Sequence, residues 1–392
     1  MKEIEKKVRE IINRVKNRGD EALLFYTKKY DGVMLKPAEL RVKKREIDRA
    51  FKKVGLNFIK VIERAKRNVE KFHFREYKQI TKKSQQLSQT TSRGIRFMEL
   101  WRPVDRVGVY VPGGRYAYPS SVLMTALPAR VAGVAGIAMV SPPAKLSCEV
   151  LAAARICGIE EIYKVGGAQA IAAFAYGTET IPRVDKIVGP GNIYVTTAKR
   201  LLFGDVGIDM LAGPSEILII ADDSANPDYV VSDLFAQVEH GKGARALLIT
   251  TSRKLKDTVE KKVKKKGISV MWVRSIKEAV RLANEFAPEH LEILAEKPER
   301  MVSEIKNAGE IFLGKWSPVA IGDYYAGPSH VLPTGATARF SSGLSVKDFL
   351  KRMVVVACSE RGLKRSARDV INFAMAEGFE SHAESIKVRL KK

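Results

Sequence analysis

The sequence is poor in cysteine, the residue that builds disulfide scaffolds and thiolate metal sites. Only three cysteines occur among its 392 residues, and no two of them form a CxxC pair. An odd number of isolated cysteines argues against a disulfide-stabilised secreted domain and favours a reducing compartment, so we expect a cytoplasmic protein. The start, MKEIEKKVREI, is charged and amphipathic without an apolar segment behind it, which predicts that no signal peptide is present.

A long, uninterrupted apolar run is also missing. The most apolar stretch, residues 122–140, is broken by Pro128, Arg130, Gly133 and Gly136. A helix that spans a membrane needs about 20 consecutive, mostly apolar residues. The stretch is instead typical of a helix, a turn and a buried strand, so we expect no membrane partner.

Acidic residues are too few to balance the basic ones, with 44 Asp and Glu against 68 Lys and Arg and a formal net charge of +24. Such a charge raises the possibility of a nucleic-acid-binding protein. However, residues 101–230 are nearly neutral, and no recognition-helix, RNP or zinc-finger spacing accompanies the basic segments. A Lys-rich solvated surface, as in heat-adapted proteins, explains the charge equally well. We therefore expect no nucleic-acid partner and keep this class as the alternative to an enzyme.

From residue 107 onward the chain alternates β-branched runs with helical segments. Strands are predicted at 107–111, 137–140, 161–165 and 186–188, and then at 217–221, 246–250, 270–273, 291–294 and 311–313. Alternation of this kind is typical of mainly parallel sheets covered on both faces by helices, so two α/β units are expected. Residues 1–75 are predicted to be helical with a stop at Gly19, residues 78–100 to be extended or looped, and the chain from about Ser345 to be helical again.

Three predicted strands end in glycine-rich turns that precede helices: Pro112-Gly113-Gly114, Gly166-Gly167-Ala168-Gln169 and Gly189-Pro190-Gly191-Asn192. The carboxyl ends of parallel strands and the amino ends of helices are where α/β proteins bind phosphorylated ligands. Tyr110, Gln169 and Asn192 are the polar side chains best placed there. None of the turns is a GxGxxG followed by an acidic residue, so plain tight turns remain an alternative to a dinucleotide site.

Histidine is scarce, with five in all, and four lie in polar, glycine-punctuated segments of the second half. They are His240, His290, His330 and His382, and each has a carboxylate within eight residues, respectively Glu239, Glu289, Asp323 and Glu377. Each alone is more typical of an ordinary polar histidine. Together, imidazoles and carboxylates drawn from distant segments indicate a metal site or an acid/base site.

Two of these segments suggest specific chemistry. Gln237 and His240 are three residues apart in a helix predicted over 230–240, so they would share a face. With Asp323 in a glycine-rich loop, they would offer oxygen and nitrogen ligands that suit a zinc-like ion with open positions. Glu289 and His290 follow Pro288 at a loop-to-strand junction, where both could reach one cavity as an acid/base pair. A surface amide and a surface Glu-His pair are the simpler alternatives.

Long strings in this sequence resemble the histidinol dehydrogenase family. The similarity runs from about residue 102 to residue 389 in matching order, in the strings RVGVYVPGG, GGAQAIAAFAYGTE, VDKIVGPGN, IDMLAGPSEIL, AQVEHG, PEHLEI, GDYYAGPSHVLPT and the Glu377…His382 tail. The resemblance implies an intertwined homodimer of α/β subunits, each with two incomplete Rossmann-like domains built on parallel sheets and small helical N- and C-terminal pieces. The expected division is a helical arm (1–20), a metal and acid/base domain (21–106 with 216–344), an NAD domain (107–215) and a tail that docks on the partner (345–392).

The resemblance also implies ligands and roles. A zinc ion would be held by Gln237, His240, Asp323 and His382 of the partner subunit. These ligands would surround the substrate together with Ser215, His290, His330 and Glu377 of the partner subunit, while NAD would contact Tyr110, Gln169 and Asn192. The implied reaction oxidises L-histidinol through an enzyme-held histidinaldehyde to L-histidine with two NAD molecules, His290 handling protons in both steps and Glu289 activating water in the second. A related zinc- and NAD-dependent dehydrogenase acting on another amino alcohol or a sulfonate is the alternative.

Overall fold

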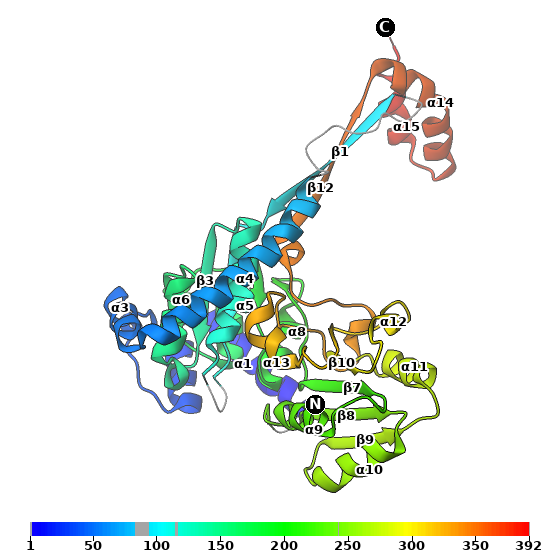
Figure 1. Cartoon of the computed structure of the whole chain (residues 1–392). Helices are drawn as coiled ribbons and strands as arrows, with labels where there is room; N and C mark the ends of the chain where they lie inside the picture. Colours follow the sequence, from blue (N-terminus) through cyan, green and yellow to red (C-terminus); the bar gives the residue numbers. More distant parts are fainter. Residues whose placement is uncertain (1, 83–93, 114–116, 242, 392) are drawn as a thin grey trace. The chain divides into compact units, whose positions relative to one another are not determined.

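The protein was analysed as a computed structural model that describes residues 2–82, 94–113, 117–241 and 243–391. The chain divides into two compact units, one formed by residues 1–74 and 104–349 and the other by residues 75–103 and 350–392. Two five-stranded sheets lie in the first unit and one two-stranded sheet in the second (Figure 1). Among the described residues, no helix is long and apolar enough to cross a membrane.

The first sheet is parallel and has the strand order β4-β3-β2-β5-β6. Its strands are β2 (Arg106–Tyr110), β3 (Gly136–Ser141), β4 (Glu161–Lys164), β5 (Lys186–Val188) and β6 (Gly207–Ile208), and its connecting helices are α5 (Pro119–Ala132), α6 (Cys148–Ile156), α7 (Gly167–Tyr176) and α8 (Ile193–Leu202). The strand order reverses between β2 and β5, which is the position where open α/β sheets bind ligands. Apart from the short β6, these strands were predicted from the sequence and are confirmed.

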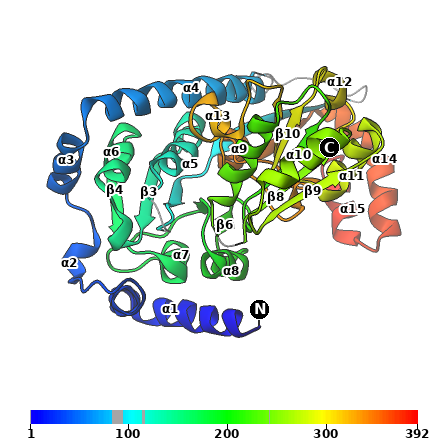
Figure 2. The same cartoon turned by 60° about the horizontal axis from the view of Figure 1, so that its bottom comes forward.

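The N-terminal helices cover this first sheet. They are α1 (Lys2–Asp31), α2 (Pro37–Leu40) and α3 (Lys44–Lys53), followed by the long α4 (Leu56–Thr81), whose end belongs to the second unit. Helix α1 lies beside α7 and α8 (Figure 2). Apolar residues of α1 belong to the same buried core as those of α7 and α8. The predicted stop at Gly19 is a kink, because this residue has φ +45° inside the segment. The predicted domain division stays a prediction, but α1 and α2 contribute apolar residues to the core of the first sheet, and α3 packs on α6.

The second sheet is also parallel, with the strand order β11-β10-β7-β8-β9. It contains β7 (Glu216–Ala221), β8 (Arg245–Thr250), β9 (Ile268–Trp272), β10 (His290–Leu294) and β11 (Glu310–Leu313), with helices α9 (Pro227–Val238), α10 (Arg253–Lys262), α11 (Ile276–Phe286), α12 (Glu299–Val302) and α13 (Val319–Ile321). Ile217 and Ile219 face α9, whereas Leu218 and Ile220 face α11. Both faces are therefore buried, as the continuous apolar run of β7 predicts.

The second unit corrects the prediction of a wholly helical tail. Residues Leu350–Cys358 form β12, which pairs antiparallel with β1 (Ile95–Pro103), and only then do α14 (Glu360–Ala376) and α15 (Glu380–Lys387) follow. The prediction was wrong because the run Val354-Val355-Val356 favours a strand. The predicted extended character of residues 78–100 holds for β1, α4 continues to Thr81, and residues 83–93 lie outside the described residues.

Candidate active site

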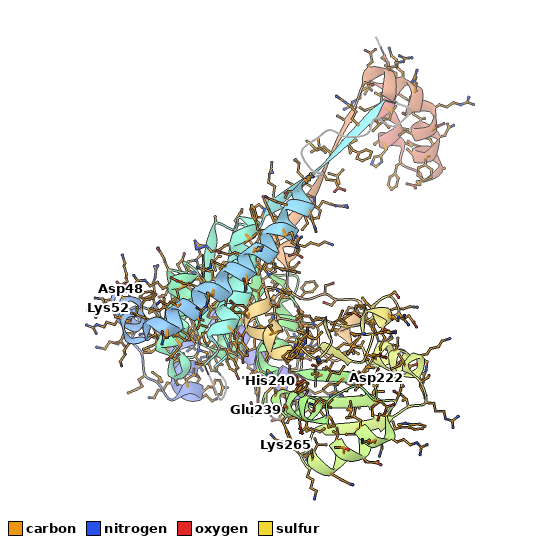
Figure 3. The ribbon with its side chains drawn as sticks, in the orientation of Figure 1. Asp48, Lys52, Asp222, Glu239, His240 and Lys265 are labelled. Atoms are coloured by element: carbon orange, nitrogen blue, oxygen red, sulfur yellow. The ribbon has the colours of Figure 1, made fainter. Side chains whose placement is uncertain are left out.

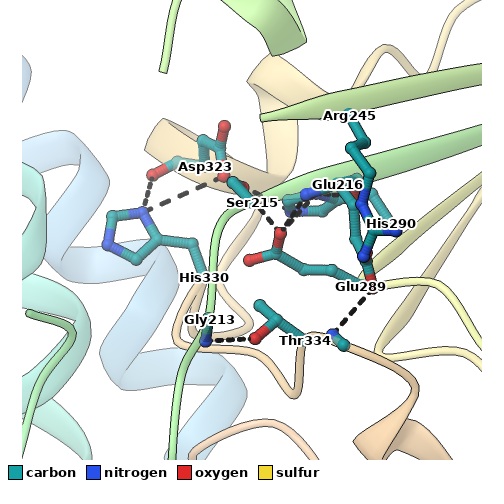
Figure 4. A network of polar contacts seen from close by, with 10 residues as sticks. Gly213, Ser215, Glu216, Arg245, Glu289, His290, Asp323, His330 and Thr334 are labelled. Atoms are coloured by element: carbon teal, nitrogen blue, oxygen red, sulfur yellow. Dashed lines mark hydrogen bonds and ion pairs between the residues drawn. The ribbon is translucent and has the colours of Figure 1, made fainter. Parts of the chain in front are cut away.

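The candidate acid/base residues lie at the amino-terminal edge of the second sheet. Glu289 precedes β10, Ser215 precedes β7, and these two strands are hydrogen-bonded neighbours with His290 opposite Ile217. The junction after Pro288 therefore brings Glu289 and His290 beside the start of β7 (Figure 4). Ligands of open α/β sheets usually bind at the carboxyl edge, so this site depends on a tertiary arrangement that strand order alone does not indicate.

Glu289 is a buried carboxyl group with two donors on one oxygen. Its Oε2 accepts a hydrogen bond from Ser215 Oγ at 2.6 Å and another from the Glu216 backbone N–H at 2.8 Å. Burial raises the pKa of Glu289 to about 8, although both hydrogen bonds favour the ionised form. A carboxyl group that changes charge near neutral pH suits acid/base chemistry.

His290 is held as a neutral imidazole with one ring nitrogen unused. Its Nδ1 lies 3.3 Å from the Glu216 carbonyl oxygen, which can only accept, so the ring proton resides on Nδ1 and Nε2 carries the lone pair. Within the described ranges, Nε2 is buried without a hydrogen-bond partner. Burial lowers the pKa of His290 to about 3, and His240 and His330 lower it further. The unused Nε2 is therefore available to accept a proton at neutral pH.

A buried frame holds the backbone that orients both residues. The Glu216 carboxylate accepts hydrogen bonds from the Gly335 N–H at 2.9 Å and from Arg245 Nη2 at 3.1 Å. Thr334 Oγ1 accepts a short hydrogen bond from the Gly213 N–H on the same approach to β7. We did not identify Glu216, Arg245 or Thr334 from the sequence. A glutamate that begins the otherwise apolar run of β7 is the signal that could have drawn attention to Glu216.

Asp323 and His330 face the same space. Asp323 Oδ1 lies 3.9 Å from His290 Nε2 and 4.0 Å from His330 Nδ1, and burial raises the pKa of Asp323 to about 6. His330 Nδ1 donates to the Asp323 carbonyl oxygen at 3.0 Å, and its Nε2 lies 3.4 Å from Ser121 Oγ in the first turn of α5. His330 thus bridges the edge of the second sheet to a helix of the first sheet.

Gln237 lies in the last turn of α9. His240, which is labelled in Figure 3, follows the end of that helix. The helix was predicted to reach His240 but ends at Val238, where the chain turns through Gly241 at φ +108°. Gln237 is 2% exposed, and its Nε2 is buried without a hydrogen-bond partner in the part of the chain that the structure describes. The oxygen and nitrogen of an amide are told apart only by their hydrogen-bond partners. The Gln237 amide therefore has one buried polar atom, oxygen or nitrogen, without a hydrogen bond. His240 is exposed but close enough to influence the pKa of His290 and His330.

The chemistry of Gln237, His240 and Asp323 fits part of a metal ligand set. Across the described residues, no three His, Cys, Asp or Glu side chains are grouped so that they could hold a metal ion. Of the four predicted ligands, His240 and Asp323 are the two in the first unit that are His, Cys, Asp or Glu residues. The third ligand in that unit, Gln237, would contribute an amide oxygen. The unsatisfied Gln237 amide agrees with such a role, and the nitrogen and oxygen donors suit zinc with open positions.

The remaining predicted ligand and substrate residues belong to the second unit. Glu377 follows the last turn of α14, and His382 lies in α15, where its ring stacks on Phe379 with centroids 5.0 Å apart. Both side chains are exposed. The first unit therefore brings together Ser215, Glu289, His290, Asp323 and His330, with Gln237 and His240 at the nearby end of α9, but neither Glu377 nor His382 is part of that unit.

The residues predicted to contact a nucleotide gather at the carboxyl ends of the first sheet. The hydroxyl of buried Tyr110, at the end of β2, accepts a hydrogen bond from the Gly167 N–H at 3.1 Å, and burial raises its pKa to about 12. Gln169, 2% exposed, lies in the first turn of α7. Exposed Asn192 caps α8, its Oδ1 accepting from the Tyr194 and Val195 N–H groups.

A buried ion pair holds the turn that carries Asn192. Lys199 Nζ contacts Asp209 Oδ1 and donates to the Gly189 carbonyl oxygen at 3.0 Å, while the Gly189 N–H donates to Asp209 Oδ2 at 2.7 Å. Gly189 has φ +113°, and a Cβ there would lie 2.2 Å from the Tyr110 carbonyl oxygen. Glycine is therefore required where this turn passes the end of β2.

Comparison with known proteins identifies the family of this chain. The family model "Histidinol dehydrogenase" matches residues 1–390. The histidinol dehydrogenase of Caldanaerobacter subterraneus subsp. tengcongensis is 49% identical, with 99% of this chain and 93% of the relative covered, and that of Bacillus cereus is 46% identical with the same coverage. The crystal structure of histidinol dehydrogenase from Elizabethkingia anophelis superposes with a TM-score of 0.91 at 36% identity, covering 98% of this chain and 92% of that one. The chain therefore belongs to the histidinol dehydrogenase family.

Proposed function

We propose that this member of the family, an NAD-dependent oxidoreductase of histidine biosynthesis in the cytoplasm, oxidises L-histidinol to L-histidine at the edge of the second sheet. One observation carries the proposal: the buried, neutral His290 has an unused Nε2 that lies 3.9 Å from Asp323 Oδ1, while its Nδ1 lies 3.7 Å from Glu289 Oε2. Neutral imidazole can take a proton from a substrate hydroxyl, and a second titratable carboxyl beside it can serve a second proton transfer.

The first step converts the alcohol to histidinaldehyde. His290 Nε2 takes the hydroxyl proton while the substrate carbon transfers a hydride to NAD, so that the alcohol loses two electrons and NAD gains them. The hydrogen bond from His290 Nδ1 to the Glu216 carbonyl keeps the ring oriented and stabilises the imidazolium that forms.

The second step needs water. Glu289 removes a proton from a water molecule as its oxygen adds to the aldehyde carbon, and the protonated His290 returns its proton to the carbonyl oxygen, which gives the hydrate. The hydrate would then pass a second hydride to a second NAD while the neutral His290 again takes a hydroxyl proton, and the resulting acid loses its remaining proton to water. The product is the carboxylate of histidine. Both steps would take place at one site without release of the aldehyde, because a free amino aldehyde is reactive.

Zinc would be held by Gln237, His240, Asp323 and His382 of the partner subunit. When bound, zinc would supply electrostatic anchoring for the substrate, which would hold the reacting carbon near His290. Ser215, His330 and Glu377 of the partner subunit would complete the contacts to the substrate. NAD would lie along Tyr110, Gln169 and Asn192, at the reversal of strand order in the first sheet.

The proposal includes a homodimer, in which each site borrows two residues from the other subunit. In the second unit, β12 and α14 expose large apolar side chains, among them Val354 (53%), Val356 (67%) and Phe373 (71%). A two-stranded sheet that exposes apolar residues is only marginally stable alone, so burial against a second copy would stabilise it.

The test follows NADH formation with L-histidinol, before and after a chelator and again after zinc is restored. We expect two NADH per histidinol, loss of activity on chelation and recovery with zinc. Failure of the zinc-loaded protein to turn over histidinol would refute the substrate assignment, and other amino alcohols or sulfonates would then be assayed. For the dimer, mixing inactive Gln237→Ala and inactive His382→Ala subunits should restore activity, because mixed dimers contain one intact site.

A further inference from the structure

The chain passes from the first sheet to the second through an irregular connection, residues 209–215, which joins β6 to β7. Because such a segment has no regular secondary structure, the position of its backbone depends on individual contacts. Its first residue is hydrogen-bonded to the turn at residues 189–192, here called the NAD turn. Its last residue, Ser215, is hydrogen-bonded to Glu289. The connection therefore joins the two parts of the proposed site.

Asp209 anchors the first end of the connection. Its backbone N–H donates to the Ile187 carbonyl oxygen at 3.1 Å. Its carboxylate accepts hydrogen bonds from the Gly189 N–H at 2.7 Å, from the Met210 N–H at 2.6 Å and from Lys199 Nζ. Lys199 also donates to the Gly189 carbonyl oxygen at 3.0 Å, and its side chain is 3% exposed, against 0% for Asp209. This buried ion pair holds the NAD turn and the start of the connection in one network.

Two threonines hold the middle of the connection. Thr196 of α8 donates from Oγ1 to the Ala212 carbonyl oxygen at 2.9 Å. At the next residue, the Gly213 N–H donates to Thr334 Oγ1 (Figure 4). Thr196 follows Asn192, the cap of α8, by one helical turn. The middle of the connection is therefore tied to the helix that begins at the NAD turn.

Ser215 ends the connection beside Glu289. Its Oγ donates to Glu289 Oε2 at 2.6 Å, and its carbonyl oxygen accepts a hydrogen bond from the Arg245 N–H at 3.1 Å. The backbone from Asp209 to Ser215 can span no more than about 20 Å, since an extended chain covers at most about 3.6 Å per residue. Over so short a segment, a displacement of one anchored residue displaces its neighbours. The contacts at residues 209 and 212 therefore influence where Ser215 lies.

The buried ion pair is suited to positioning. The cost of removing two charges from water offsets their attraction, so a buried pair by itself adds little to stability. Here each charged group has more than one hydrogen-bond partner, which compensates for its burial. Apolar side chains could fill the same space, but hydrophobic contacts are non-directional, whereas hydrogen bonds constrain distance and angle. The pair therefore supplies a fixed geometry that apolar packing would not.

We propose that the connection 209–215 positions Ser215 beside Glu289 relative to the NAD turn. The buried ion pair and Thr196 are its positioning residues, which act through other residues and not on the substrate. The inference rests on the proposed function, since it takes Glu289 as the group that activates water and the NAD turn as part of the NAD site. A displacement of about 1 Å at a reacting group can cost about 100-fold in rate, so the loss of one anchor among several should cost less.

The test compares Thr196→Val, Thr196→Ser and Lys199→Met in zinc-loaded protein. Valine has the shape of threonine without its hydroxyl, serine keeps the hydroxyl, and methionine replaces the lysine stem without its charge. We measure the KM for NAD and the single-turnover rates with histidinol and with histidinaldehyde.

We expect Thr196→Val to slow the histidinaldehyde step about tenfold. Its KM for NAD and its histidinol step should stay within about threefold of wild type, because the ion pair still holds the NAD turn. Thr196→Ser should restore the histidinaldehyde step. Lys199→Met should slow this step by a similar factor and should also raise the KM for NAD about tenfold, because it removes the contacts to both the NAD turn and the connection.

Thr197→Val is the matched control, because it makes the same chemical change at the next residue of α8, which contributes none of the hydrogen bonds above. It should keep the wild-type KM and rates, and urea denaturation checks that each variant is folded. A wild-type histidinaldehyde rate in folded Thr196→Val would overturn the positioning role, as would an equal loss in Thr196→Ser or Thr197→Val.

An unchanged KM for NAD in folded Lys199→Met would also overturn it. If Lys199→Met does not fold, the threonine variants decide the matter alone. A wild-type protein that oxidises neither histidinol nor histidinaldehyde would instead overturn the proposed function, and this inference with it.

Discussion

Replacing His290 with asparagine isolates the ring nitrogen that we assign as the base. The asparagine amide can occupy the place of Nδ1 and still donate to the Glu216 carbonyl oxygen, which lies 3.3 Å from Nδ1 in the native ring. Nothing in asparagine replaces Nε2. The variant therefore removes the proton acceptor but retains the hydrogen bond that orients the residue.

The size of the effect follows from the role. General base catalysis contributes about 100- to 10,000-fold to a rate, which corresponds to roughly 3–5 kcal/mol of transition-state stabilisation. We expect kcat to fall by that factor with histidinol and also with histidinaldehyde, because His290 takes a proton in both steps. Stability should fall by no more than about 2 kcal/mol, since most single substitutions cost 0.5–3 kcal/mol and the hydrogen bond to Glu216 is kept.

The assay measures NADH formation from each substrate separately, with histidinol affinity determined by calorimetry and folding by urea denaturation. His290→Gln serves as the matched comparison, because its amide reaches the position of Nε2 but cannot accept a proton at neutral pH. We expect it to be as impaired as His290→Asn. Rates within tenfold of wild type for both substrates in a folded His290→Asn variant would refute the assignment of His290 as the base.

Three further predictions concern Glu289, Gly189 and Glu292. Glu289→Gln should slow the oxidation of histidinaldehyde about 100-fold or more, but it should slow the oxidation of histidinol to the aldehyde by less than about tenfold. Single-turnover measurements on each substrate would compare the two rates, and equal losses would contradict a role of Glu289 in water activation. Gly189→Ala should weaken NAD binding and lower the free energy of unfolding by about 1–3 kcal/mol, because alanine would have to adopt φ +113° with its Cβ against the Tyr110 carbonyl oxygen. An unchanged NAD affinity in a fluorescence titration would count against a role of this turn in NAD binding. Burial, together with Asp233, raises the pKa of Glu292 above its ordinary 4.5, so the folded protein keeps a proton that the unfolded chain has released. The wild type should therefore lose stability relative to Glu292→Gln as pH rises between about 5.5 and 8, by up to about 1 kcal/mol per pH unit in urea titrations. A parallel pH dependence of the two proteins would argue against a protonated Glu292 in the folded state.

Local sequence patterns predicted the two parallel sheets well, because a strand that is buried on both faces has a continuous run of apolar residues. The runs 217–221 and 291–294 agree with β7 and β10 to within one residue. The apolar pattern did not predict β12, because most residues of this strand are exposed. The three consecutive valines of β12 favour a strand, but no regular alternation of buried and exposed residues accompanies them, so we predicted a helical tail there. Likewise, α9 ends before His240 because of a backbone turn at Gly241.

The sequence by itself determined the fold class, the family and the types of groups that carry the chemistry, since these depend on local patterns and on long matching strings. It did not indicate that the acid/base residues lie at the amino edge of their sheet, nor that Glu216 and Arg245 hold the backbone beneath them. Those features were decided by tertiary structure, because burial shifts the pKa of Glu289, His290 and Glu292 only once segments far apart in the chain exclude water around them.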